Sequence, residues 1–260
     1  MTGTIRLALD ARGVATLTLI RPDKRNALSA QMIADLTQAA AALGRDPAVR
    51  VVVLTGQGDS FCAGGDLDWM RAQMAADGPT RAIEARKLAM MLDALNTLPK
   101  PLIGRVQGQA YGGGIGMMAV CDVAVGVDTA RFGLTETRLG LIPATIGPYV
   151  VARMGAACAR RVFMSGRIFA APEAVSLGLL SRVVPLDALD AAIEAEVAPY
   201  LACAPGAVAE AKALIRTLCP MPDAAAIEAS IAALVTRWEG PEAAEGIAAF
   251  FDKRRPVWAQ

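Results

Sequence analysis

Residues 112–120 read Gly112-Gly113-Gly114-Ile115-Gly116-Met117-Met118-Ala119-Val120, and this stretch decides the fold. A glycine triplet opens it, an apolar run follows, and an apolar strand pattern stands on either side, at residues 102–106 and 123–127. The pattern predicts a strand, a glycine turn, a short helix and a second strand. Repetition of such units builds a mostly parallel α/β sheet with right-handed crossovers.

The same alternation of strand and helix extends toward the N-terminus. Residues 5–10 and 14–20 predict a hairpin that turns at Gly13, and residues 50–55 predict a buried strand. Ser29 is a good N-cap for a helix that Gly44 would end, and Pro79 would open a second helix that stops at residues 99–101. The side chains expected to face inward are Met32, Ile33, Leu36, Ala39, Ala40 and Leu43 in the first helix, and Ile83, Leu88, Met91, Leu92 and Leu95 in the second.

The pattern changes after about Val184. Residues 187–218, 224–238 and 241–251 all predict helix, and no further strand follows. We therefore divide the chain into an α/β core at 1–186 and a helical region at 187–260. Such helices either dock onto another subunit or simply cover one face of the core, and the sequence leaves both interpretations open.

The composition restricts the chemistry. The chain has 260 residues, of which 54% are hydrophobic, so it can bury a substantial core. It contains no histidine, which excludes Ser-His-Asp and Cys-His nucleophile systems and every histidine-ligated metal site. Proton transfer must therefore fall to Asp, Glu, Lys, Tyr, Cys or water.

Charge and cysteine usage indicate the surroundings of the protein. The formal net charge is +1, and no basic stripe with interleaved aromatic residues predicts nucleic-acid binding. The 5 cysteines are scattered and form no C-x-x-C pair, as expected for reduced thiols in the cytoplasm. No secretion signal is evident at the N-terminus, and Gly, Pro or charged residues interrupt every long apolar run, so we expect no membrane span.

Two glycine turns could present bare backbone N–H groups to a ligand. Gly64 and Gly65 lie in the run 61–67, Phe-Cys-Ala-Gly-Gly-Asp-Leu, and the second turn is Gly112-Gly113-Gly114. Each precedes a predicted helix start, where N–H groups lack internal partners. Two such groups aimed at one oxygen would form an oxyanion hole, although a purely structural turn explains either cluster taken alone. Neither turn matches the phosphate-binding glycine motifs.

Glu136 is the candidate acid/base. Arg131 and Arg138 lie near it in the sequence, so a solvated ion pair is the simplest interpretation. Its apolar setting, which includes Phe132 and Leu134, favours another one. A carboxyl group in an apolar pocket has a raised pKa and can shuttle protons.

Taken together, these motifs resemble the enoyl-CoA hydratase/isomerase (crotonase) family in order and spacing. The resemblance rests on residues 61–67, 111–116, 121–122, 132–136 and 139–143, on Arg21-Pro22 with Asn26-Ala27-Leu28, and on residues 165–179. It implies a ClpP-like spiral of ββα units with a helical C-terminal trimerisation region, assembled as a homotrimer or a dimer of trimers. It also implies an acyl-CoA substrate and no cofactor other than the coenzyme A that the substrate carries.

The resemblance assigns roles residue by residue. Gly65 and Gly113 would hold the thioester oxygen with their N–H groups, and Glu136 would act as general base or as proton donor and acceptor at carbon. The residues implied in substrate binding are Lys24 and Arg25 at the CoA phosphates, Ala63 and Leu67 with Gly65 at the adenine, the neighbouring motif residues Ala27, Gly64, Asp66, Gly112, Gly116 and Pro143, and Phe250 and Lys253 at a neighbour's CoA site.

Five further residues are expected to shape the acyl pocket: Tyr111, Trp69, Met70, Ile142 and Thr145. For Tyr111, Trp69 and Met70, plain core packing explains the sequence equally well.

One position departs from the pattern of the two-glutamate hydratases in this family. Those enzymes carry a first glutamate where this chain has Gly116, so only Glu136 remains. The resemblance therefore also allows a Δ3,Δ2-enoyl-CoA isomerase that uses a single glutamate. Residues 140–151, 114–116 and 68–70 instead resemble the bacterial methylglutaconyl-CoA and isohexenylglutaconyl-CoA hydratase subgroup, whose substrates carry a carboxylate that could help to position water. A non-catalytic acyl-CoA-binding or assembly subunit is the alternative of another class.

Overall fold

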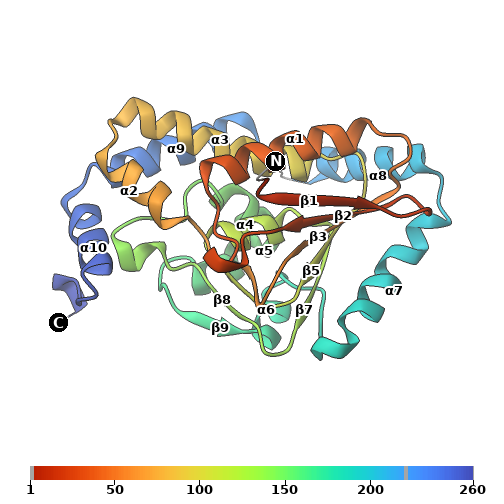
Figure 1. The fold of residues 1–260 in the computed structure, drawn as a ribbon. Helices are drawn as coiled ribbons and strands as arrows, with labels where there is room; N and C mark the ends of the chain where they lie inside the picture. Colours follow the sequence, from red (N-terminus) through yellow and green to blue (C-terminus); the bar gives the residue numbers. More distant parts are fainter. Residues whose placement is uncertain (1–2, 220–221, 260) are drawn as a thin grey trace.

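The computed structural model describes residues 3–219 and 222–259, and it contains two sheets. The six-stranded sheet has the order β1-β2-β3-β5-β7-β10, and the four-stranded sheet has the order β4-β6-β8-β9 (Figure 1). The larger sheet comprises β1 (Ile5–Leu9), β2 (Val14–Leu19), β3 (Val51–Gly56), β5 (Leu102–Val106), β7 (Val123–Val127) and β10 (Arg182–Val184). The smaller comprises β4 (Ser60–Cys62), β6 (Gln109–Tyr111), β8 (Arg131–Gly133) and β9 (Ile168–Ala170).

From β3 to β8, consecutive strands alternate between the two sheets, which makes this part of the chain a spiral. β3, β5 and β7 join the larger sheet, and each is followed by a strand of the smaller sheet, β4, β6 and β8. Helices follow these pairs: α2 (Leu67–Ala75) and α3 (Gly78–Asn96), then α4 (Gly113–Ala119), then α5 (Gly147–Val162). All strand pairs are parallel except β1 with β2 and β8 with β9. The predicted α/β spiral with a mostly parallel sheet is therefore confirmed.

The N-terminal predictions hold, apart from the role of one glycine. β1 and β2 form the expected hairpin, and Ser29 caps α1 (Ala30–Arg45) by accepting a hydrogen bond from the Met32 N–H. Gly44, however, lies inside α1 and does not end it. A Cβ at Gly44 would lie 3.2 Å from Pro99 Cδ, so this glycine allows α1 to pack closely against the loop that follows α3.

The second predicted helix also needs a correction. α3 begins at Gly78, with Asp77 as its N-cap, and Leu92 is fully buried as expected. Ile83 is wrong as an inward residue, because 54% of it is exposed. Ala85 and Ala89 face the core, and Ile83 lies two residues, or about 200°, around the helix from Ala85.

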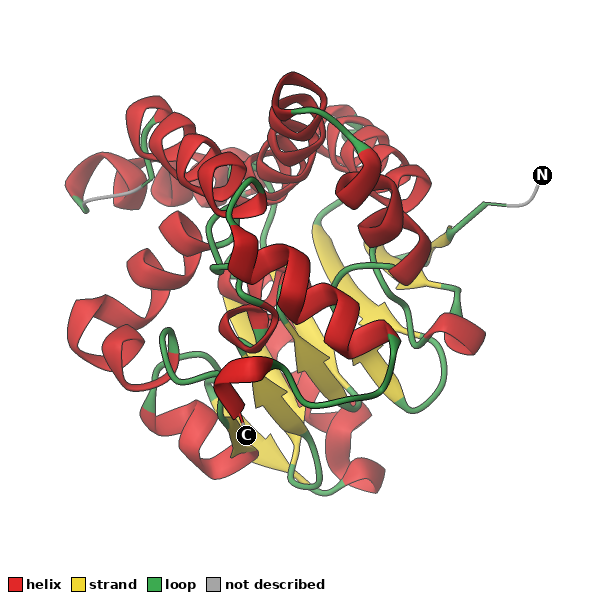
Figure 2. Ribbon diagram, turned by 90° about the vertical axis from the view of Figure 1, so that its left-hand side faces the viewer, coloured by secondary structure: helices red, strands yellow, loops and turns green. Residues whose placement is uncertain are grey.

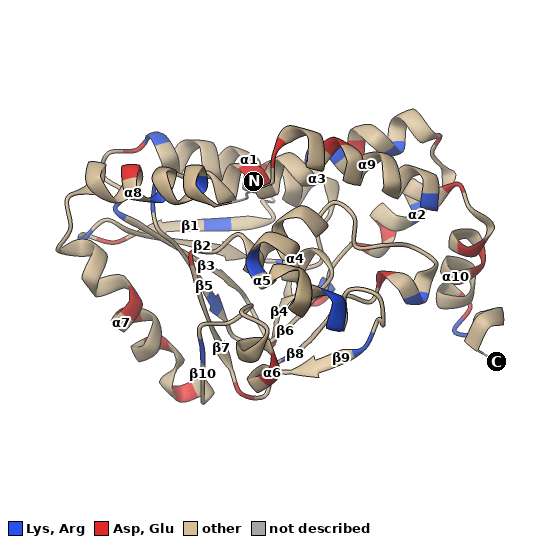
Figure 3. Cartoon of the chain, turned by 180° about the vertical axis from the view of Figure 1, so that it is seen from behind, with Lys and Arg blue, Asp and Glu red and all other residues tan. Residues whose placement is uncertain are grey.

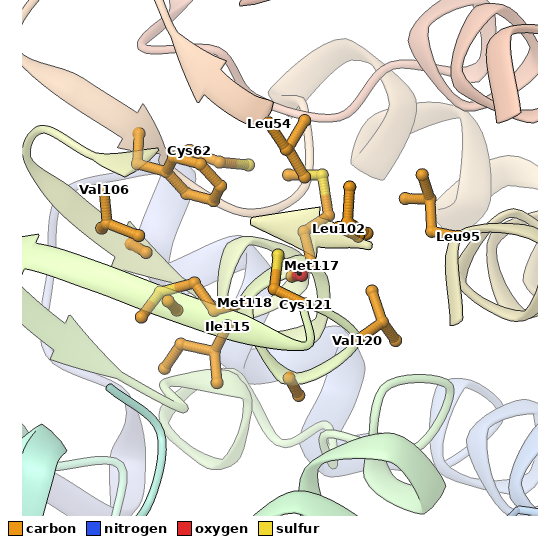
Figure 4. Close-up of a cluster of buried hydrophobic side chains, with 14 of the residues drawn as sticks. Leu54, Cys62, Leu95, Leu102, Val106, Ile115, Met117, Met118, Val120 and Cys121 are labelled. Carbon is orange, nitrogen blue, oxygen red and sulfur yellow. Dashed lines mark hydrogen bonds between the residues drawn. The ribbon is translucent and has the colours of Figure 1, made fainter. Parts of the chain in front are cut away.

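The main core lies between the larger sheet and the buried helix α4. Figure 4 shows side chains from β3, β5 and α4 packed together, including Leu54, Leu102, Ile115 and Met117. All residues of α4 after Gly113 are buried. Because a helix that is apolar on every side must be surrounded by protein, α4 cannot slide or rotate freely, and its N-terminus is held at a defined place.

The C-terminal region is helical as predicted, with one break. After α6 (Ala171–Ser176) the chain forms α7 (Leu189–Leu201), α8 (Pro205–Leu218), α9 (Ala224–Trp238) and α10 (Pro241–Phe251). The single run expected at 187–218 is wrong, because Pro205 begins a new helix and the residue before a proline is driven out of the helical region. The last strand ends at Val184 and α7 begins at Leu189; the domain boundary at 186/187 stays a prediction.

The helices surround the strands (Figure 2), and two of them reach the catalytic half of the core. α9 packs along α3, and α10 packs against a 3₁₀ turn at Glu136–Leu139, which we call η2. By contrast, α8 buries none of its side chains. Figure 3 shows Lys and Arg interspersed with Asp and Glu over the elements in that view, without a face of one sign.

Candidate active site

A cavity of about 320 Å³ lies where the two glycine turns, η2 and the C-terminal helices meet. Most of the residues predicted for the site line it: Ala63, Gly64, Gly65, Leu67, Trp69, Met70, Tyr111, Gly112, Gly113, Glu136, Ile142, Pro143, Thr145 and Phe250. Within the described part of the chain, Glu136 is the only charged side chain of its lining. The cavity is therefore an apolar pocket with one carboxyl group.

The first glycine turn is held by a short bridge to Leu28. The Leu28 N–H donates to Gly64 O and the Asp66 N–H donates to Leu28 O, at 2.8 and 3.0 Å. Gly64 has φ +94°, and a Cβ there would lie 3.2 Å from Tyr111 O. Glycine is thus required for the conformation of this turn and for its approach to the second turn.

Asp66, predicted as a substrate-binding residue, lies outside the cavity and organises the first turn. Its carboxylate caps α2 by accepting hydrogen bonds from the Asp68 and Trp69 N–H groups, and it pairs with Arg21 Nη2 at 2.7 Å. Burial alone would raise the pKa of Asp66, but the hydrogen bonds from Arg21, Trp69 and Asp68 outweigh it and lower the pKa. Asp66 therefore stays ionised and supports the N-terminal end of α2.

The second glycine turn brings the backbone against the carboxyl group. Gly112 has φ +46° and ψ −114°, and a Cβ there would lie 3.0 Å from Glu136 Oε1. Gly113 follows as the first residue of α4, where a Cβ would lie 2.5 Å from Leu28 Cδ1. Both positions leave no room for a side chain, so the turn presents bare backbone to the cavity.

Two residues that line this cavity have backbone N–H groups without a partner in the described part of the chain. Within residues 3–219 and 222–259, neither the Gly65 N–H nor the Gly113 N–H donates a hydrogen bond to a backbone or side-chain acceptor. Gly113 is at the N-terminus of a helix, where the first N–H groups have no acceptor within the helix. Gly65 and Gly113 both line the cavity, so their N–H groups are available to an oxygen bound there.

Glu136 is the candidate acid/base group of the cavity. It begins η2, its Oε2 atom is buried, and no described residue gives that atom a hydrogen bond. Burial raises the pKa of Glu136 to about 7. A carboxyl group with that pKa exchanges between its two forms near neutral pH, as proton transfer requires.

The structure explains the glycine at position 116. Gly116 lies within α4, and a Cβ there would lie 2.6 Å from Ile146 Cγ2. Ile146 lines the cavity and Gly116 does not. The isoleucine therefore occupies the space that a larger side chain at 116 would need, and the wall of the cavity on that side is apolar.

Four other predicted residues also lie outside the cavity. Ala27 is buried, and Lys24 and Arg25 are exposed on a 3₁₀ turn beside the first glycine turn, where Arg25 O accepts from the Ala63 N–H at 3.0 Å. Their contact with the phosphates of a bound thioester stays a prediction. Lys253 is exposed beyond α10. Phe250 lines the cavity of its own chain, and its contact with a neighbour's site stays a prediction.

Sequence reasoning missed part of the lining. Thr135, Leu139, Leu141, Ala144 and Ile146 adjoin predicted motifs, and that adjacency could have identified them. Leu28, Ile33, Leu88, Ile168, Leu234 and Trp238 complete the wall. Leu234 and Trp238 come from α9, some hundred residues after Glu136, and nothing in the local sequence of α9 distinguishes them from ordinary core residues.

The comparisons with known proteins agree with this geometry. The family model described as enoyl-CoA hydratase/isomerase matches residues 10–260. The chain belongs to the enoyl-CoA hydratase/isomerase family. Mevalonyl-coenzyme A hydratase sidH of Aspergillus fumigatus is 35% identical over 254 residues, which cover 94% of this chain and 91% of that protein.

Solved structures of family members superpose over nearly the whole chain. An enoyl-CoA hydratase from Mycobacterium smegmatis is 37% identical with a TM-score of 0.80, and the match covers 99% of each chain. Pseudomonas aeruginosa AtuE is also 37% identical, with a TM-score of 0.81 and coverage of 99% of this chain and 100% of that one. The fold of the chain is thus the crotonase fold of this family.

Two further observations concern the described residues. They contain no cluster of three or more His, Cys, Asp or Glu side chains arranged to hold a metal ion. Among the helices of residues 3–219 and 222–259, none is both long and apolar enough to cross a membrane.

Proposed function

We propose that this chain is an enoyl-CoA hydratase that adds water to the double bond of a branched or carboxylated α,β-unsaturated acyl-CoA. One observation carries the proposal: two unpartnered N–H groups, of Gly65 and Gly113, line the same apolar cavity as a carboxyl group whose pKa is raised to about 7. Hydro-lyase chemistry is also the activity in the names of the family members described above.

The proposed reaction uses each of these groups. The thioester oxygen accepts hydrogen bonds from Gly65 and Gly113, which stabilise the negative charge that develops on it. Ionised Glu136 takes a proton from water, and the water oxygen bonds to Cβ while the double-bond electrons move to form an enolate. Protonated Glu136 then returns that proton to Cα, the enolate collapses, and the thioester carbonyl is restored. Atoms and charges balance with one carboxyl group, because the same proton leaves water and reaches carbon.

The proposed acyl preference is for a branched or carboxylated group, and it can be tested by comparing two thioesters. The apolar wall at Ile146 and the name of the mevalonyl-CoA relative, whose acyl group is branched, support a branched substrate. A substrate carboxylate would find no Lys or Arg among the described residues of the lining, and the side-chain donors there are the hydroxyl groups of Thr135, Thr145 and Tyr111 and the indole N–H groups of Trp69 and Trp238. If a substrate carboxylate nevertheless positions the water, 3-methylglutaconyl-CoA will be hydrated much faster than crotonyl-CoA. Equal rates on the two would contradict that role.

Isomerisation is the second candidate, and the single carboxyl group of the cavity favours it. Glu136 could remove a proton from one carbon and return it to another while the same oxyanion hole holds the enolate. A non-catalytic acyl-CoA-binding subunit is the alternative of another class. It would keep the cavity and bind the thioester without turnover.

The proposal includes self-association. α8 buries no side chain, and Leu214, Ile215 and Leu218 are more than half exposed on it. An apolar face of this kind is suited to contact with another subunit, and we propose a homotrimer or a dimer of trimers. Sedimentation of the purified chain would test the assembly, because a monomer at micromolar concentration contradicts it.

We also propose a cytoplasmic location, since all five cysteines are unpaired. The proposed reaction needs no cofactor beyond the coenzyme A of the substrate.

The decisive experiment incubates the protein with linear, branched and carboxylated enoyl-CoA thioesters and measures the products by mass. A gain of one water identifies hydration, and an unchanged mass with a moved double bond identifies isomerisation. We expect hydration, with the highest kcat/KM on a branched thioester. Binding of the thioesters without any product would support the non-catalytic alternative.

A further inference from the structure

The carboxyl group of Glu136 has no side-chain anchor. No described residue donates a hydrogen bond to Oε2, and no side chain pairs with the carboxylate as a salt bridge. Most buried polar groups in proteins are held by such contacts. The direction of this carboxyl group therefore depends on the backbone of η2, from which it projects, and on whatever holds that backbone in place.

Arg237 holds the end of this backbone turn. Its Nε and Nη2 atoms donate to Gly140 O at 3.2 and 2.8 Å, and Gly140 is the left-handed C-cap of η2. Nη2 also pairs with Glu242 at the start of α10. Within the turn, the Leu141 N–H donates to Glu136 O at 3.1 Å. One guanidinium group thus joins α9, α10 and the turn that carries Glu136.

The backbones of α10 and η2 also meet directly. A Cβ at Gly246 would lie 2.5 Å from the carbonyl carbon of Leu139, and one at Gly140 would lie 2.3 Å from Glu242 O. Leu141, Trp238, Ala243 and Ile247 form a small hydrophobic cluster separate from the main core, across this contact. Neither backbone can shift toward the other, so η2 rests on a rigid surface made by the C-terminal helices.

We propose that Arg237 is a positioning residue for Glu136: through Gly140 O it fixes η2 against α10 and so aims the carboxyl group at the cavity. This inference rests on the proposed function, because it deepens the role of the same carboxyl group. It assigns a catalytic consequence to helices that contribute no reacting group of their own. Displacement of a positioned group by about 1 Å is enough to lower turnover about 100-fold in other enzymes.

The first test compares Arg237→Gln with Arg254→Gln. Arg254 is a matched control, because two of its nitrogens pair with Glu245 of α10, the helix to which Arg237 also binds through Glu242. None of the hydrogen bonds of Arg254 reaches η2 in the described part of the chain. We expect Arg237→Gln to lower kcat about 10- to 100-fold with KM changed less than about threefold. Arg237→Lys, which keeps one donor for Gly140 O, is expected to recover part of the loss, and Arg254→Gln is expected to keep the kcat of the unmodified chain.

A second pair of variants tests the same contact between η2 and α10. Gly246→Ala places a methyl group against the backbone of Leu139, whereas Gly206→Ala in α8 meets nothing within 4 Å. We expect Gly246→Ala to lower kcat as Arg237→Gln does, and Gly206→Ala to have no effect on it. Thermal unfolding of all five variants separates misplacement of Glu136 from loss of folded protein.

A third measurement does not depend on activity. Titration of the Glu136 carboxyl group by ¹³C NMR should find a pKa about 7 in the unmodified chain and a lower one in Arg237→Gln, because a carboxyl group that swings away from its buried position regains water. An unchanged pKa together with unchanged kcat in Arg237→Gln would overturn the proposal, as would an equal loss in Arg254→Gln. If the unmodified chain hydrates no thioester, the proposed function fails, whereas the NMR titration still decides the positioning role.

Discussion

The two sides of the cavity differ in composition: one consists of backbone N–H groups and a carboxyl group, and the other consists of apolar side chains. On one side we place Gly65 and Gly113, whose N–H groups have no partner among the described residues, together with the carboxyl group of Glu136. On the other side Leu234, Trp238 and Phe250 of the C-terminal helices present apolar side chains. In the proposed reaction, backbone N–H groups bind the thioester oxygen that every acyl-CoA shares, whereas side chains contact the acyl part that differs. Chemistry and acyl preference can therefore vary separately in this site.

The largest effect is expected on the chemical side. Glu136→Gln removes the proton-transferring group without changing the size of the side chain, and we expect kcat to fall about 100-fold or more. Steady-state kinetics on the preferred thioester measure this. Glu245→Gln, which alters a carboxylate of α10 outside the cavity, is the control. Near-normal turnover of Glu136→Gln would remove Glu136 from its role and with it the contrast between the two sides.

The pH dependence tests the same side without a substitution. Because burial raises the pKa of Glu136 to about 7 and the ionised form must accept the proton of water, kcat/KM is expected to be constant above that pH. Well below it, kcat/KM should fall about tenfold per pH unit, which amounts to about 50-fold between pH 7 and pH 5. Circular dichroism at each pH confirms that the chain stays folded. A flat profile over this range would show that another group transfers the proton.

Gly112→Ala probes the contact between the second glycine turn and Glu136. A side chain at this φ is strained by about 1–3 kcal/mol, and its Cβ would press on Oε1. We expect kcat to fall about 10- to 100-fold. Gly155→Ala in α5 is the matched control: Gly155 has φ +72° but no atom within 4 Å, so it adds strain without contact. Equal losses of kcat in both variants would show that backbone strain, and not contact with Glu136, causes the effect.

Stability should move in the opposite direction from activity at Glu136. Its pKa is raised from 4.5 to about 7, so burial of the neutral form is favourable below pH 4.5, and this contribution is lost as the pH rises through 7. Glu136→Gln avoids the buried charge and is expected to increase the free energy of unfolding at pH 8 by about 1–3 kcal/mol. Urea unfolding at pH 8 and pH 5 checks this. A gain of the same size at both values would point to a cause other than ionisation.

The smallest effect is expected on the apolar side. Phe250 is 47% exposed and lines the cavity, so Phe250→Ala removes limited contact area. We expect KM for the largest accepted acyl group to rise about threefold and kcat to change less than about twofold. Phe251→Ala is the control, because Phe251 packs against Arg71 and not against the cavity. A drop in kcat as large as that of Glu136→Gln would mean that the two sides are not separate.

Local signals in the sequence predicted the alternation of strands and helices and the two glycine turns, whereas the spiral and the roles of the residues at the cavity followed from the family resemblance. Strand and helix periods, the Ser29 cap and the glycine turns are local signals, and glycine at a positive φ is required by the backbone itself. For that reason the strands β1, β2, β3, β5 and β7, the start of α4, the candidate oxyanion-hole glycines and Glu136 could be located before the structure, whereas the three-residue strands β4, β6, β8, β9 and β10 were not predicted. The errors at Gly44 and Ile83 arose where packing, not local conformation, decided the role of the residue.

Only the tertiary structure decided which distant residues meet at the cavity. Leu234 and Trp238 reach it, and Arg237 reaches Gly140 O of η2, because the C-terminal helices fold back onto that turn, whereas Asp66 lies outside the cavity and pairs with Arg21. Likewise, Gly116 leaves room for Ile146, which lies thirty residues later in the chain. Such contacts depend on the relative placement of whole helices. That placement is set by the burial of apolar faces over the entire molecule, and no local pattern of sequence carries it.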